Sequence, residues 1–99
     1  MGDYRNNNMK SYSSIPTFQA ERMSKRLAKH WEHKFPVNKT DQYFEIQMPS
    51  ATVRLSPLDE HLDVEISPLD TTVDMAFLQK VVVDHLERMG NEALNATWH

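Results

Sequence analysis

The chain has 99 residues, of which 39% are hydrophobic and 25% are charged, a composition typical of one small globular domain. It contains no cysteine, which excludes disulfides, thiolate metal sites and a cysteine nucleophile. No apolar run approaches the roughly 20 residues that span a bilayer, and the N-terminus has no signal-peptide pattern. We therefore expect a cytoplasmic protein with no membrane partner.

The formal net charge is −3, but the charges are unevenly distributed along the chain. Residues 1–40 carry eight Lys and Arg against three Asp and Glu, whereas residues 41–99 carry three against eleven. The two halves should attract each other where they pack, and the folded domain should keep a dipolar surface.

The first part of the chain predicts a tail, a short extended segment and a helix. Residues 1–10 are polar and are predicted to form a disordered tail. Ser11–Ile15 is compatible with a short extra strand, since Tyr12 and Ile15 suit a strand. A helix is predicted over Phe18–Lys34, with Thr17 as its N-cap and Pro36 after its end. Its buried stripe is Ala20, Met23, Leu27 and Trp31.

The middle of the chain alternates between apolar and polar residues in three runs separated by turn residues. The first run is 43–48, the second centres on Val53 and Leu55, and the third is 61–66. This pattern predicts an antiparallel meander with one face in the core and one in water. The inward residues are Phe44, Ile46, Met48, Val53, Leu55, Leu62, Val64 and Ile66.

A second helix is predicted towards the C-terminus, from about Phe77 to Met89. Thr71 and Asp74 resemble a capping box, and Gly90 stands where a left-handed C-cap belongs. The predicted fold class is α+β, with two amphipathic helices packed on one face of a three-stranded antiparallel meander (α-β-β-β-α). The single domain is predicted to cover 11–90, and residues 91–99 to form a frayed tail.

Histidines supply the densest group of candidate functional side chains. His30 and His33 lie three residues apart on the first helix, and the spacing of His85 places it on the buried side of the second. If the helices pack side by side, His30 and His85 approach each other, with Lys34 and Arg88 nearby. Two imidazoles can ligate a metal with further donors. The alternative is structural, with His33 and Lys34 complementing the helix dipole and the other two histidines hydrogen-bonded.

Two surfaces are candidates for binding larger partners. The basic residues Arg22, Lys25, Arg26 and Lys29 can form an anion or nucleic-acid surface, or simply a solvated helix face. They lack interleaved aromatic residues and any nucleic-acid motif, so a nucleic-acid partner is not expected. The outer sheet face should carry cross-strand charge pairs and is open to a protein partner. Its residues are Tyr43, Glu45, Arg54, Asp63 and Glu65.

Catalytic motifs are absent from the sequence. With only Gly2 and Gly90, the chain has no glycine-rich phosphate loop. Its carboxylates fall on strand and turn positions where nothing is expected to raise a pKa for acid–base work. We therefore predict a non-enzymatic protein without a cofactor.

Two runs of sequence, Leu27–Val37 and Val82–Met89, resemble the bacterial domain-of-unknown-function family 2218. The resemblance covers about 14–90 and implies a small α+β domain with no established activity. It also implies an association with siderophore-utilisation genes. The resulting hypothesis is an accessory or binding module for a metal, a metal chelate (siderophore-linked iron use) or an anion. The alternative is a structural or protein-interaction domain that uses its basic helix or its open sheet face.

Overall fold

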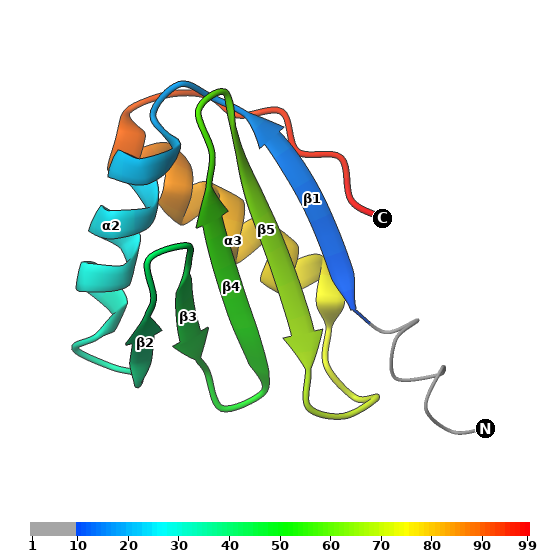
Figure 1. Cartoon of the computed structure of the whole chain (residues 1–99). Helices are drawn as coiled ribbons and strands as arrows, with labels where there is room; N and C mark the ends of the chain where they lie inside the picture. Colours follow the sequence, from blue (N-terminus) through cyan, green and yellow to red (C-terminus); the bar gives the residue numbers. More distant parts are fainter. Residues whose placement is uncertain (1–9) are drawn as a thin grey trace.

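A computed structural model describes residues 10–99 of the chain (Figure 1). The predicted N-terminal tail, apart from Lys10, lies outside the described residues. The elements in chain order are β1 (Ser11–Pro16), α2 (Ala20–Trp31), β2 (Val37–Lys39), β3 (Phe44–Gln47), β4 (Ala51–Pro57), β5 (His61–Pro68) and α3 (Met75–Gly90).

The strands form one five-stranded antiparallel sheet in the order β1-β5-β4-β3-β2. The predicted meander is its centre, β3-β4-β5, so the α+β class is confirmed but three strands are too few. The short N-terminal strand is present as β1, which pairs with β5 and places Ile15 opposite Leu62. Strand β2 was not predicted, because its three residues are too few to show a period-two pattern.

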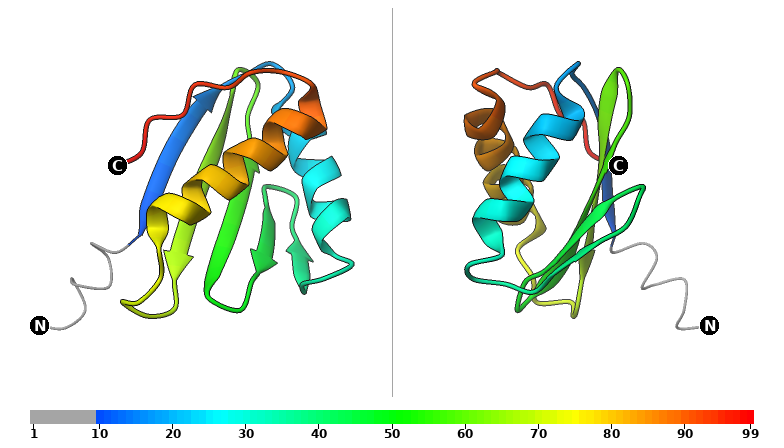
Figure 2. Two further views of the ribbon diagram at one scale, coloured as in Figure 1. Left: turned by 180° about the vertical axis from the view of Figure 1, so that it is seen from behind. Right: turned by 60° about the vertical axis from the view of Figure 1, so that its left-hand side comes forward.

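Both helices cover the same face of the sheet, and the other face is left open (Figure 2). The alternation of the central strands follows this arrangement, since β4 and β5 bury every second residue. Their inward side chains form one core with apolar side chains of β1, β3, α2 and α3. Its fully buried members include Ile15, Met23, Leu27, Ile46, Val53, Leu55, Leu62, Val64, Ile66, Val82 and Leu86.

Helix ends differ in detail from the sequence predictions. Gln19, not Thr17, is the N-cap position of α2, and the Thr17 hydroxyl accepts a bond from the Gln19 backbone N–H instead. Asp74 itself caps α3 by accepting from the Phe77 N–H at 3.1 Å, so Thr71 does not form the predicted box. The left-handed residue after α3 is Asn91, with φ of 50°.

Gly90 is not the predicted left-handed C-cap; it lies in the last turn of α3, close to Met23 of α2. A Cβ atom at Gly90 would come 2.8 Å from Cγ of Met23, which is too close for a methyl group. Side chains from the α2 region also bind the end of α3. Arg26 donates to the Met89 carbonyl at 3.1 Å and Gln19 to the Gly90 carbonyl at 3.2 Å. These bonds satisfy carbonyls that have no partner within the helix.

The C-terminal segment 91–99 packs against the domain rather than fraying. It runs beside β1, and His99 exchanges two backbone hydrogen bonds with Tyr12, at 2.8 and 3.2 Å (Figure 1). Leu94, Ala96 and Trp98 pack on the core as every second residue of the segment. The structure therefore differs from the predicted frayed tail. Burial of these three apolar side chains favours the docked segment, while the polar residues between them stay in solvent.

Candidate functional site

His85 is held in one orientation on the half-buried side of α3. Its Nδ1 lies 2.7 Å from the carbonyl oxygen of Val81, one helical turn earlier. A carbonyl oxygen only accepts hydrogen bonds, so Nδ1 carries the proton and donates. In the neutral ring the lone pair then resides on Nε2, which is the arrangement found in many metal-binding histidines.

The packing of α2 against α3 brings two further rings to His85. The ring of Trp31 lies 5.0 Å away, centroid to centroid, and that of His30 lies 5.9 Å away. Trp31 is buried and contacts Phe35 edge-on, whereas His30 is exposed. We call His30, Trp31 and His85 the histidine seam. It has a buried aromatic wall and an imidazole on each of its two helices.

The remaining residues of the predicted site are less closely placed. His33 and Lys34 follow the end of α2 and are exposed, and within residues 10–99 their side chains make no hydrogen bond or ion pair. Arg88 is also exposed, on the last turn of α3. The structure thus brings together His30 and His85 from the predicted set. His33, Lys34 and Arg88 are left around that pair as exposed cationic or titratable groups.

A complete metal site is not formed by the protein alone. No group of three or more His, Asp or Glu side chains in the described part of the chain could hold a metal ion. The histidine seam offers two imidazoles, and structural zinc sites need about four ligands. Any metal held there needs its other donors from elsewhere.

Only part of the predicted basic surface remains available in the folded domain. Arg26 is turned to α3, where it binds the Met89 carbonyl, so it contributes to the join between the helices. The other three residues, Arg22, Lys25 and Lys29, are exposed on α2.

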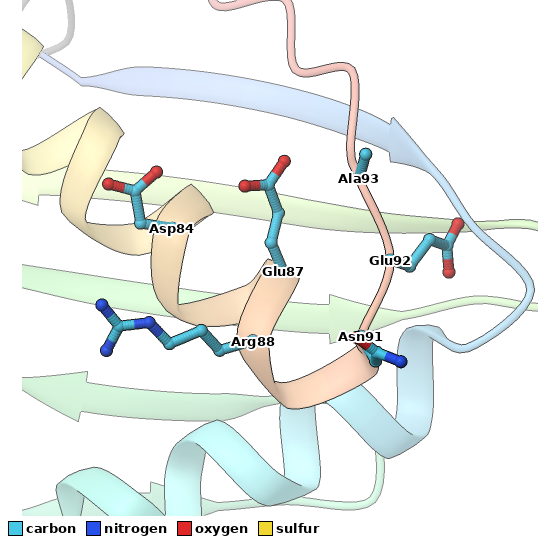
Figure 3. A pocket seen from close by; sticks show the side chains of 6 residues that line it. All are labelled: Asp84, Glu87, Arg88, Asn91, Glu92 and Ala93. Atoms are coloured by element: carbon cyan, nitrogen blue, oxygen red, sulfur yellow. The ribbon is translucent and has the colours of Figure 1, made fainter.

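A hollow at the end of α3 is lined by Asp84, Glu87, Arg88, Asn91, Glu92 and Ala93 (Figure 3). Its carboxylates already have partners. Asp84 pairs with Lys80 at 3.1 Å, Glu87 accepts from the Leu94 N–H at 2.9 Å, and Glu92 accepts from Thr17 and Gln19. Arg88 leaves the helix on a different side from Asp84 and Glu87 (Figure 3). We therefore infer that the carboxylates of this hollow have a structural role: Glu87 and Glu92 hold the start of segment 91–99 in place.

The open sheet face carries the cross-strand pairs that the sequence predicts. Arg54 binds Glu45 at 2.9 Å, and its guanidinium lies 4.2 Å from the centre of the Tyr43 ring. Tyr12 stands on the same face, where partial burial and then the negative charge of Asp63 raise its pKa above 10.0. The charges of this face largely satisfy one another.

Two features near the candidate surfaces were not predicted from the sequence: the carbonyl that orients His85, and the exposure of Phe18. The Val81 carbonyl that orients His85 could have been found, because it lies four residues earlier on the same helix. Phe18 is predicted to begin the first helix, but it lies before α2 and its side chain is 84% exposed. Nothing in the sequence distinguishes this exposed aromatic residue from a buried one.

The chain is similar to a bacterial protein family and to one solved bacterial structure. The family described as uncharacterized protein conserved in bacteria, DUF2218, matches residues 12–99. The NMR structure of PA4090 from Pseudomonas aeruginosa is 35% identical, with a TM-score of 0.74 over 91% of this chain and 94% of that one. No curated protein matches significantly. Within residues 10–99, no helix is long and apolar enough to cross a membrane.

Proposed function

The chain belongs to the bacterial family DUF2218, and for this member we propose a non-enzymatic module that binds an anionic metal chelate at the histidine seam. The observation that carries the proposal is the pairing of His85, which has its Nε2 available, with the His30 ring 5.9 Å away. Two imidazoles on one ion, with bonds of about 2 Å, have ring centroids about 5–6 Å apart.

The number of ligands favours a chelate over a bare ion. With two nitrogen donors the domain can fill only part of a coordination sphere. A chelate that leaves positions open supplies the other donors. Imidazole binds zinc, copper, nickel and iron, so the seam suits a transition metal and not calcium or magnesium.

The charges near the seam favour an anionic chelate. Lys29 and Lys34 flank His30 along the chain, both are exposed, and neither forms an ion pair within residues 10–99. Arg88 adds a cation one turn after His85 on α3. Exposed cations of this kind raise the local concentration of an anionic ligand and its association rate.

An amide-shift titration with zinc nitrilotriacetate tests the proposal. This complex is anionic and diamagnetic, and it keeps coordination positions open for imidazole. We expect saturable shifts in α2 and α3 around His30 and His85, and weaker effects from zinc alone or from free nitrilotriacetate.

Matched variants assign the ligands in the same titration. His30→Gln and His85→Gln should each weaken binding of the zinc chelate by tenfold or more, whereas His33→Gln and His61→Gln should not change it. Binding that survives His85→Gln but is lost in His33→Gln would place the site on the helix surface and refute the seam.

A further inference from the structure

Among residues 10–99, the most exposed large apolar side chain lies beside the basic face of α2. Phe18 is 84% exposed, and it lines a surface hollow with Gln19, Glu21, Arg22 and Lys25. Two further exposed aromatic residues of the described chain, Tyr12 and Phe77, are on β1 and α3. Aromatic residues and arginine are enriched in protein interfaces, and this hollow contains Phe18 and Arg22.

Arg22, Lys25 and Lys29 continue from this hollow along α2 as one row. Their spacing of three and four residues puts them on one side of the helix, with neighbours about 5–6 Å apart. We call these three residues the basic stripe. The apolar stripe of α2 faces the core, so the basic stripe faces solvent.

The three side chains of the basic stripe have no hydrogen-bond or ion-pair partner within residues 10–99, whereas several other cations are paired. Lys10, Arg54 and Lys80 each pair with a carboxylate, and Arg26 binds a helix-end carbonyl. In the part of the chain that the structure describes, no hydrogen bond or ion pair engages the side chains of Arg22, Lys25 and Lys29. Their charge is therefore available to an external ligand.

We propose that Phe18 and the basic stripe form a docking surface for an acidic segment of a partner protein that also carries an apolar side chain. The carboxylates of that segment would pair with the stripe, and its apolar side chain would pack on Phe18. If the acidic segment is a helix, carboxylates three and four residues apart lie on one side of it, which matches the spacing of the stripe.

The surrounding charge favours a short acidic segment over an extended polyanion. Glu21 and Glu32 flank the stripe along α2, and the chain as a whole has a net charge of −3. A nucleic acid or an anionic membrane covers a wide area and is repelled by these carboxylates, whereas a short segment contacts only the stripe.

The probe is a synthetic helical peptide with one leucine and three glutamates spaced to match Phe18 and the stripe. We expect amide shifts confined to Phe18 and the exposed side of α2. Arg22→Glu with Lys25→Glu should weaken binding about tenfold or more, and Phe18→Ser about tenfold. Lys39→Glu, an exposed cation on β2, should change it less than about twofold.

The controls separate this surface from other partners and from the histidine seam. His30→Gln with His85→Gln should keep peptide binding, so the two proposals can fail independently. Affinity that is unaffected by Phe18→Ser, or shifts outside α2, would overturn the proposal. Tighter binding of single-stranded DNA or of phosphatidylserine vesicles through the same residues would also overturn it and assign the surface to that ligand.

Discussion

Gly90 of α3 and Met23 of α2 approach so closely that a Cβ atom on Gly90 would lie 2.8 Å from Cγ of Met23. Met23 is fully buried, so it cannot move into solvent to make room. Glycine at this position therefore allows the close approach of the two helices.

The first prediction is the sign of the effect of Gly90→Ala on stability. Helix propensity alone favours alanine by up to about 1 kcal/mol. The contact with Met23 instead predicts a loss of about 1–3 kcal/mol in the free energy of unfolding, measured in urea. In the Met23→Ala background the clash is gone, and the same change should be neutral or stabilising. Stabilisation of the wild type by Gly90→Ala would contradict the close approach.

A second prediction concerns the hydrogen bond from Arg26 to the Met89 carbonyl. Arg26→Met keeps the aliphatic part of the side chain but leaves that carbonyl to water, so we expect a loss of about 0.5–1 kcal/mol in unfolding free energy. Lys25→Met, the matched change of an unpaired neighbour, should be within about 0.5 kcal/mol of wild type. Equal effects of the two substitutions would argue against the cap.

The third prediction distinguishes two candidate caps for α3. Asp74 accepts from the Phe77 N–H, so Asp74→Ala should destabilise the domain by about 1 kcal/mol. Thr71→Ala should have little effect, because Thr71 precedes the helix and does not cap it. Thermal unfolding of both variants checks this, and the reverse order would restore the capping box predicted from the sequence.

A fourth prediction is the titration of Tyr12. Its pKa is raised above 10.0 by partial burial, and then by the negative charges of Asp63 and Glu65. Because the folded pKa lies above the unfolded one, this group favours folding below pH 10 and loses that contribution as the pH rises through the folded pKa. Asp63→Asn should lower the pKa of Tyr12, as measured by the ring carbon shift of Tyr12. An unchanged pKa would exclude Asp63 as a cause.

How far the sequence predicted the fold depends on the length of each pattern. The strands around Ile46, Val53 and Val64 alternate over enough residues to reveal their inward face. The pairing of β1 with β5 could not be read in the same way, because α2, β2, β3 and β4 lie between them in the chain. The packing of 91–99 was not predicted, because Leu94, Ala96 and Trp98 alternate with polar residues over only a short segment.

The candidate site was predictable in part, because helical spacing shows which side of each helix a residue occupies. Helical spacing put His85 on the buried side of its helix and His30 near the end of the other, and helix packing brought their rings to 5.9 Å. The same spacing suggested that His33 and Arg26 share functional surfaces with their neighbours. It could not show that Arg26 turns to the end of α3, since that depends on where the two helices cross.

The most direct test of the histidine seam follows the imidazole nitrogens of His30 and His85 by NMR as zinc nitrilotriacetate is added. The structure predicts that Nδ1 of His85 is protonated before addition, because it donates to Val81. On addition, the Nε2 resonance of His85 and one nitrogen resonance of His30 should move together to positions typical of metal-bound imidazole, while Nδ1 of His85 stays protonated. Movement at His33 alone, or no change at His85, would contradict the proposed site.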